Sequence, residues 1–394
     1  MASFWHRGAR LRLRAVLALG AAVTAATFVM AAPAQAALSG TGWTAATVPS
    51  GFDFADAPFS PVSCVAGTPV CVAVTFDLAV QGVNGTIGHG ALVTTDGGAT
   101  WKGYPIAPSS SINPLAISCP TTKVCWIAGA GPEDQPEVAV TPNGGRTWKL
   151  ATPAAWANAP FSWWPNSVDC VSVTTCWLAG ETANSTQNPM VAKTTNGGLT
   201  WTTLSNLPTV PPDANGDTYL LNGISCSSAS SCVAGGGVNG GPGPAAVIST
   251  TDGGATWSMS ADPALAPVQQ VMSLSCLAAS GGPVCHAAGF APQVGGPVAL
   301  TSLDAGATWT VTPPFDTTGW LSSISCADTQ HCWAAGAGTT VALAGTTDGG
   351  STWSTVTSDT TNQQGQVSCA TLTFCVAATD GGLRVTNTNG GLTG

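Results

Sequence analysis

An aspartate followed by two glycines is the first group in this chain whose type and setting could support chemistry. The eight residues TTDGGATW occur at Thr94–Trp101 and again at Thr250–Trp257. Related octets begin at Thr141, Thr194, Ser302, Thr346 and Asn387. The acidic position is held by Asp96, Asp252, Asp304 and Asp348 in four copies and by Asn143, Asn196 and Asn389 in three. Because a catalytic acid or a metal ligand would need the charge, and all copies share only a hydrogen-bond acceptor, these side chains are predicted to be structural.

The local chemistry of the octet favours a turn. An Asp or Asn side chain accepts hydrogen bonds from nearby backbone N–H groups, and the glycines that follow can adopt a positive φ. The closing tryptophan is large enough to fill the space between neighbouring units of a repeat. Six copies carry it, as Trp101, Trp148, Trp201, Trp257, Trp309 and Trp353, and the copy at Asn389 lacks it.

Fourteen cysteines are the second set of residues that could support chemistry, and they occur as seven close pairs. The pairs are Cys64/Cys71, Cys119/Cys125, Cys170/Cys176, Cys226/Cys232, Cys276/Cys285, Cys326/Cys332 and Cys369/Cys375. Zinc is the alternative, but cysteines that bind zinc are about two to four residues apart and need co-ligands. Here five to eight residues separate the partners. A disulfide within each pair is therefore predicted, as is typical of exported proteins.

A repeat of short strands must position these residues. In each unit one alternating run ends at the first cysteine, a second begins at the second cysteine, a third leads into the octet and a fourth follows it. Seven units of four strands predict an all-β fold, a seven-bladed β-propeller with four antiparallel strands per blade. The segment Gly40–Val48 contains Trp43 and has the pattern of a fourth strand without a blade. This N-terminal strand is predicted to complete the last blade.

The octets resemble the Asp-box, or bacterial neuraminidase (BNR), repeat, whose pattern Ser/Thr-x-Asp-x-Gly-x-Thr-Trp is matched in six of the seven units. The resemblance covers nearly all of the chain after its first residues and implies a propeller of the sialidase-like superfamily. That superfamily includes sialidases, xyloglucan-cleaving hydrolases, sortilin-like receptors and the photosystem II assembly factor. The last is similar in size to this chain, although the paired cysteines are an addition to its pattern.

The first residues are interpreted as a secretory signal. Residues 1–36 combine arginines between Arg7 and Arg14, an apolar run to about Ala32 and the small-x-small site Ala34–Ala36. A retained membrane anchor is the alternative. Residues 37–394 then form a single propeller, and we expect a secreted, extracellular monomer with no membrane span after cleavage.

The charge of the chain argues against nucleic acid as a partner. The formal net charge is −9, and removal of the signal takes away four of the ten basic residues and none of the nineteen acidic ones. The mature chain therefore carries −13, with six scattered cations. A nucleic-acid binder needs a basic stripe to displace counterions, which these cations do not form.

Function is expected on the face opposite the octets and the cysteine hairpins, where the connecting loops vary most. Aromatic and acidic residues gather in three of these loops, and the candidate binding residues are Trp156, Phe161, Trp163, Trp164, Trp320, Asp53 and Asp316. Exposed aromatic rings stack on sugars or anchor a protein partner. The alternative is that the tryptophans pack over the end of the central channel.

A calcium loop is a weaker candidate in the same set of connections. Asp213, Asn215 and Asp217 have the alternating oxygen ligands of such a loop, but the glutamate that completes an EF-hand is absent. No cofactor is expected.

Catalysis has little support in the residues. The sialidases that the octet resembles hold the substrate carboxylate with three arginines, and the mature chain has only Arg146 and Arg384. A glycoside hydrolase needs two carboxylates about 5–10 Å apart, and no pair stands out in the loops. We therefore expect a non-catalytic propeller that binds an extracellular partner protein or polysaccharide, with a glycoside hydrolase as the alternative.

Overall fold

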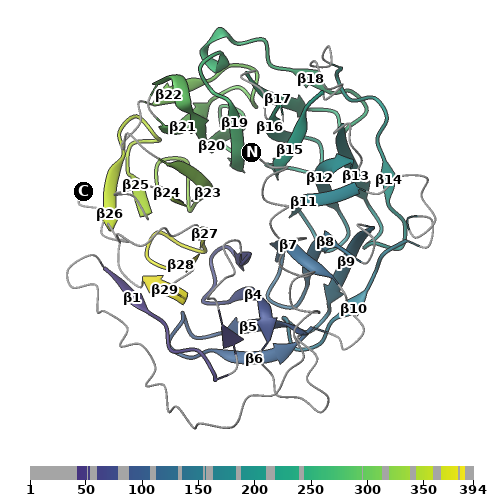
Figure 1. Cartoon of the computed structure of the whole chain (residues 1–394), viewed down its shortest axis with the longest axis vertical. Helices are drawn as coiled ribbons and strands as arrows, with labels where there is room; N and C mark the ends of the chain where they lie inside the picture. Colours follow the sequence, from purple (N-terminus) through teal and green to yellow (C-terminus); the bar gives the residue numbers. More distant parts are fainter. Residues whose placement is uncertain are drawn as a thin grey trace, which may run out of the picture.

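The computed structural model describes residues 42–50, 52–53, 60–78, 88–106, 112–131, 135–153, 156, 163–182, 188–209, 218–238, 244–294, 296–312, 319–337, 343–357, 365–379 and 382–386. Seven sheets stand around a central axis like the blades of a propeller (Figure 1). The predicted fold class is confirmed. Helical residues in the described part of the chain are those of the short 3-10 segments η3 (Pro263–Leu265) and η4 (Pro292–Val294), together with Trp156. In that part of the chain, no helix is long and apolar enough to span a membrane.

Each blade has four antiparallel strands from the axis outward, and the first blade has a fifth, short one. The four follow sequence order except in the last blade, where the first strand of the chain is outermost. The innermost strands are β3 (Val62–Cys64), β7 (Asn113–Ser118), β11 (Trp163–Cys170), β15 (Leu220–Cys226), β19 (Gln270–Leu277), β23 (Trp320–Cys326) and β27 (Gly365–Cys369). The second strands are β4 (Cys71–Leu78), β8 (Cys125–Ala130), β12 (Cys176–Thr182), β16 (Cys232–Gly237), β20 (Val284–Ala291), β24 (Cys332–Ala337) and β28 (Cys375–Thr379).

The outer half of each blade begins with the strand that leads into the octet. These third strands are β5 (Gly88–Thr94), β9 (Pro136–Thr141), β13 (Pro189–Thr194), β17 (Ala245–Thr250), β21 (Gly296–Ser302), β25 (Leu343–Thr346) and β29 (Gly382–Thr386). The outermost strands are β6 (Lys102–Pro105), β10 (Lys149–Leu150), β14 (Thr202–Thr203), β18 (Ser258–Met259), β22 (Thr310–Thr312), β26 (Ser354–Thr357) and β1 (Trp43–Ala45).

The hairpin of the fifth blade differs from the prediction in one detail. The second cysteine of each pair is predicted to open a strand, but β20 begins one residue before Cys285, at Val284, and β19 continues one residue past Cys276. Val284 lies opposite Leu277, so the ladder extends one pair beyond the two cysteines. The physical reason is the longer loop, since Cys276 and Cys285 are nine residues apart and leave room for this additional pair before the chain turns.

The N-terminal strand completes the last blade, as predicted. β1 pairs with β29 so that Trp43 lies opposite Thr386 and Ala45 opposite Arg384. Trp43 is 1% exposed and packs in one cluster with Trp333 of the preceding blade. The first and last described strands are thereby joined in one sheet.

The core lies between the blades, because each sheet is covered on both faces by its neighbours. Strand β12 is buried at every position, as expected for a strand without a solvent face. The residue after the second cysteine packs against the octet tryptophan of the next blade. Trp126 meets Trp201 edge-to-face with ring centroids 5.8 Å apart, and Trp177 meets Trp257 in the same way at 6.0 Å.

The first blade departs from the pattern. Its innermost strand β3 has only three residues, and a second short strand, β2 (Phe52–Asp53), pairs with the far end of β4. The residues between β2 and β3 lie mostly outside the described part of the chain. The inner edge of this blade is therefore made by two separate segments.

Candidate functional site

The octet carboxylates are committed to their own turns. Thr94 Oγ1 donates to Asp96 Oδ1 over 2.9 Å, and Thr100 donates its backbone N–H to the same oxygen over 2.9 Å. The Thr100 hydroxyl donates to the other oxygen over 2.5 Å, and Thr94 Oγ1 accepts the N–H of Gly98 over 2.9 Å. Both carboxylate oxygens and the glycine N–H are thus used inside the turn.

The asparagine copies keep the same geometry with one hydrogen bond reversed. Asn143 Oδ1 accepts the backbone N–H of Thr147 over 2.9 Å, and its Nδ2 donates to the Thr147 hydroxyl over 2.9 Å. In the aspartate copy at Asp252, hydrogen bonds from the hydroxyl and the backbone N–H of Thr256 lower the pKa of the carboxyl to about 2. A carboxylate that stays ionised, and whose oxygens already accept hydrogen bonds within the turn, is a poor general acid. This agrees with a structural role.

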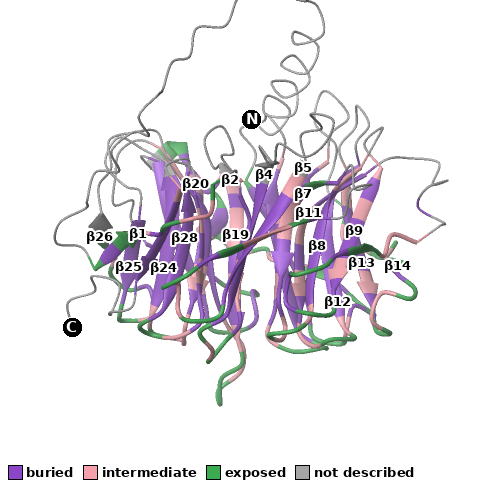
Figure 2. Ribbon diagram, turned by 90° about the horizontal axis from the view of Figure 1, so that it is seen from below, coloured by how far each residue is buried: buried purple, intermediate pink, exposed green. Residues whose placement is uncertain are grey.

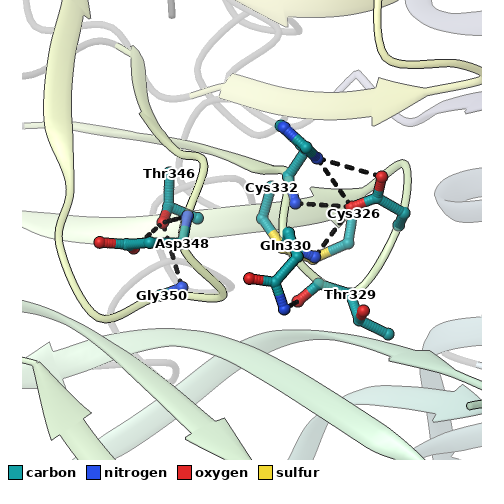
Figure 3. A network of polar contacts seen from close by, with 9 residues as sticks. Cys326, Thr329, Gln330, Cys332, Thr346, Asp348 and Gly350 are labelled. Carbon is teal, nitrogen blue, oxygen red and sulfur yellow. Dashed lines mark hydrogen bonds and ion pairs between the residues drawn. A yellow bond between two sulfur atoms is a disulfide. The ribbon is translucent and has the colours of Figure 1, made fainter. Parts of the chain in front are cut away.

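The octets and the cysteine hairpins lie on one face, here called the box face. In five blades a glycine N–H of the octet donates to a carbonyl in the cysteine hairpin, as Gly253 does to Ser230 over 2.9 Å. Exposed turns line this rim of the disc (Figure 2). Figure 3 shows the two parts side by side in the sixth blade, with Thr346, Asp348 and Gly350 facing the hairpin closed by Cys326 and Cys332.

All fourteen cysteines form the predicted disulfides, each within its own hairpin. The bonds are Cys64–Cys71, Cys119–Cys125, Cys170–Cys176, Cys226–Cys232, Cys276–Cys285, Cys326–Cys332 and Cys369–Cys375. The later start of β20 does not disturb the fifth bond, because Cys276 and Cys285 lie directly opposite each other in the ladder. Seven disulfides are typical of a protein in an oxidising compartment.

One grouping superficially has the composition of a metal site, since His286 lies beside Cys326 and Cys332. The two sulfurs are bonded to each other, so neither can supply a thiolate ligand. His286 is fully buried, and burial lowers its pKa. The grouping is therefore a packed histidine against a disulfide.

The tryptophans predicted in a loop of the opposite face, here called the loop face, are largely inside the protein. Trp163 and Trp164 belong to β11 itself and are 2% and 6% exposed. Trp156 is 6% exposed and meets Trp163 edge-to-face, with centroids 5.4 Å apart. These rings have little surface on which a ligand could stack. Trp156 and Trp163 pack between the second and third blades, and not over the end of the central channel as the alternative had it. Trp320, at the start of β23, is only half-buried.

Several candidates lie outside the described residues: Phe161, Asp316, Asn389 and the proposed calcium ligands Asp213, Asn215 and Asp217. Asp53 is described as a residue of β2 opposite Asp77, and nothing is concluded about its side chain.

The central channel contains a set of hydrogen bonds between blades that the sequence analysis did not predict. The residue before the first cysteine of each blade caps the cysteine N–H of the next blade, over distances of 2.7–3.1 Å. The acceptors, in chain order, are Ser63, Ser118, Asp169, Ser225, Ser275, Ser325 and Ser368. We call this closed circle of seven inter-blade hydrogen bonds the serine ring. It satisfies N–H groups on the free edges of the innermost strands, which would otherwise be unpaired.

The serine ring has a sequence signal. Serine precedes the first cysteine in six of the seven units, and aspartate does so in the third. Serine is common in polar turns, so the periodicity by itself did not indicate which atoms the hydroxyls contact.

Nearer the loop face, β-bulges add further links between blades. Asn166, Asn222 and Ser322 are the extra residues at three of these bulges. Asn166 Nδ2 donates to the carbonyl of Leu221 in the next blade over 3.0 Å, and Ser322 Oγ donates to that of Gly365 over 2.7 Å. Bulges redirect side chains at the rims of β-structures, and here they aim polar groups from one blade to the next.

The channel is a cavity of about 220 Å³ lined by the innermost strands of all seven blades. Its described lining is uncharged except for Asp169. Asp169 Oδ2 accepts the N–H of Cys226 over 2.7 Å, and the carboxyl also accepts hydrogen bonds from the Cys170 N–H and the Ser118 hydroxyl. Burial nevertheless raises the pKa of Asp169 to about 6.

A second hollow, of about 440 Å³, lies on the box face between the fifth and sixth blades. Its lining includes Leu303, which is 70% exposed, together with Asp304 and Asp348. Both carboxylates are bound inside their own octets. This hollow therefore offers a shallow surface with no uncommitted acid or base among its described residues.

Comparisons by sequence and by shape give different results. No family model and no curated protein matches the chain. By shape it is similar to YCF48 from Cyanidioschyzon merolae, with a TM-score of 0.55 and 14% identity over 88% of this chain and 98% of that one. A structure described as YCF48 bound to D1 peptide gives 0.56 and 16% over 91% and 99%. A polysaccharide lyase, PL25 ulvan lyase, gives 0.52 and 10% over 88% and 94%.

At these identities the similarity establishes the fold, and the octet geometry establishes its type. Seven four-stranded blades, the Asx turns of the boxes and the tryptophans between blades occur together in this chain. The chain is a seven-bladed β-propeller of the BNR, or Asp-box, type.

Proposed function

We propose that this protein is a secreted, non-catalytic propeller that binds an extracellular partner protein or polysaccharide through its loop face and the adjoining mouth of the central channel. The carrying observation is the serine ring with its bulge links. Its hydrogen bonds join the seven blades into one rigid scaffold. The described lining of the channel contains a single carboxylate. A rigid frame that presents variable connections is the usual architecture of a binding protein.

The similar structures are compatible with both kinds of partner. One was solved with a peptide, and another belongs to a protein that acts on a polysaccharide. Because the fold hosts several functions, this supports the class of ligand and not its identity.

A screen tests the proposal. The mature oxidised protein would be assayed against immobilised glycans and extracellular proteins, together with two variants. Trp320→Ala removes a half-buried ring at the loop-face end of β23, and Leu199→Ser changes a side chain that is 83% exposed on the box face. We expect Trp320→Ala to weaken binding at least tenfold and Leu199→Ser to leave it unchanged. Equal loss in both, or loss only in Leu199→Ser, would place the site on the other face.

One observation favours the alternative of glycoside hydrolysis. Burial raises the pKa of Glu137, whose β9 position is at the loop-face end of its blade. A carboxyl with a raised pKa is the usual general acid of such enzymes. Release of reducing sugar from plant or microbial polysaccharides, abolished by Glu137→Gln, would replace the non-catalytic proposal with this one.

A further inference from the structure

Asp169 occupies a place where the other six blades have serine. Its structural task is to accept one N–H from the next blade, and a serine oxygen does this at 2.9–3.1 Å in the rest of the ring. The ring geometry therefore needs an acceptor at this position but neither a second oxygen nor a charge. The second oxygen and the negative charge go beyond this ring bond, and the carboxyl also accepts hydrogen bonds from the Cys170 N–H and the Ser118 hydroxyl.

The charge on Asp169 has no counter-ion in the described surroundings. The elements packed against it are β7 through Ser118 and β15 through Cys226, which is in a disulfide. The lining of the cavity holds no lysine, arginine or histidine among its described residues. Asp169 is only partly exposed to the channel. A carboxylate in such a place without a cation is unfavourable, because its hydrogen bonds only partly replace the lost water.

The surroundings are suited to a cation with N–H donors. Ring serines present hydroxyl oxygens on both sides of Asp169, and a hydroxyl can turn to accept as well as donate. A divalent metal ion usually collects several carboxylates, whereas a single carboxylate with neutral oxygens matches a single positive charge. The three donors of a primary ammonium could be shared between the carboxylate and neighbouring oxygens.

We propose that the central channel binds a primary ammonium group on an unbranched chain, such as a lysine side chain of the partner, with Asp169 as its counter-ion. This inference rests on the proposed binding role. Because Asp169 precedes Cys170 and so lies toward the box-face end of β11, a partner at the loop-face mouth would have to extend a segment into the channel to bring the group to it. It adds the chemical class of the group that is recognised and the residue that recognises it.

The ionisation of Asp169 gives the proposal a pH dependence with a definite sign. Its pKa is raised from 3.8 to about 6 in the folded protein, so the folded state binds the proton more tightly than the unfolded state. The folding equilibrium constant should therefore fall roughly 100-fold through this residue as pH rises from about 4 to about 6, and then level off. An ammonium ligand should bind above this range, where the carboxylate is charged, and not below it.

The test measures the unfolding midpoint of the mature protein with three probes at matched ionic strength: n-butylammonium, tetramethylammonium and calcium chloride. At pH 7.5 we expect a saturable rise with butylammonium alone, and none at pH 4.5. Asp169→Ser should have a higher midpoint without probe at pH 7.5 and no response to butylammonium. Asp252→Asn, which removes one charge on the box face, should respond like the wild type.

Each other result overturns the inference. A butylammonium response that persists in Asp169→Ser, or no response in the wild type, rejects the site. A calcium response lost in Asp169→Ser would assign the channel to a metal ion instead. Asp169→Asn keeps size and acceptor if the serine variant folds poorly. Because the probes are small molecules, their result is independent of the partner screen, and a partner bound without any ammonium response would reject this inference alone.

Discussion

At the scale of single residues, the fifth octet carries an alanine where strain is expected. The first glycine of the octet has a φ between 68° and 76° at Gly97, Gly144, Gly197, Gly253 and Gly349. Ala305 takes the same place with a φ of 59° and is the only non-glycine residue with positive φ among the described residues. A Cβ in this left-handed region clashes with the backbone, so the fifth turn is held in place by its surroundings.

We predict that Ala305→Gly stabilises the protein by about 1 kcal/mol, since relief of the left-handed strain exceeds the extra entropy of glycine in the unfolded chain. The reciprocal change Gly253→Ala should destabilise it by a similar amount, and Gly281→Ala, where a Cβ would meet nothing within 4 Å, serves as a control. Denaturant unfolding of the three variants measures this. A loss of stability in Ala305→Gly would contradict the strain.

Prediction from sequence worked best for residues whose role is local. The Asp or Asn of the octet contacts atoms within four residues, and each cysteine pairs within its own hairpin. Turn chemistry and spacing were therefore sufficient. Asp169 could not be recognised in this way, because its partner Cys226 is 57 residues further along the chain.

At the scale of the element, the blade is a hairpin closed by a disulfide and extended by an octet. The strand order followed from the cysteine and octet spacing. The point where a strand begins on the loop face did not follow from this spacing, since Trp163 and Trp164 are predicted in a loop but lie in β11. Whether an apolar residue near a strand end is in the strand depends on its surroundings in the fold, and here Trp163 is covered by Trp126 of the preceding blade and Trp201 of its own blade.

Removal of one disulfide should weaken a blade without unfolding the propeller. The double variant Cys226→Ser with Cys232→Ser opens a loop of sequence separation 6, which the chain-entropy model values at about 2 kcal/mol. We expect a lower unfolding midpoint with unchanged circular dichroism at room temperature. The matched comparison is Cys276→Ser with Cys285→Ser, where the separation is 9, and it should cost slightly more. Complete unfolding of either variant would show that the disulfides are required for folding.

At the scale of the whole molecule, stability depends on closing the ring. Trp43 contributes the last side chain to the interface between the sixth and seventh blades. Trp43→Ala should therefore lower the unfolding free energy by about 3–5 kcal/mol, as for other buried tryptophans. Thr47→Ala, at an exposed position just beyond β1, should change it by less than about 0.5 kcal/mol. Denaturant titration distinguishes the two, and equal small effects would mean that β1 adds little to closure.

The pairing of β1 with β29 also orders events in time. Thr44 donates to the carbonyl of Val385 across 341 residues, whereas the disulfides join cysteines only 6 to 9 residues apart. Contacts of short separation form early, and those of long separation late. In a chain that emerges N-terminus first, the hairpin disulfides can therefore form one after another. β1 can pair only after β29 has been synthesised, so its edge stays exposed until then. During that interval the unpaired edge of the incomplete last blade is open to pairing with a neighbouring molecule.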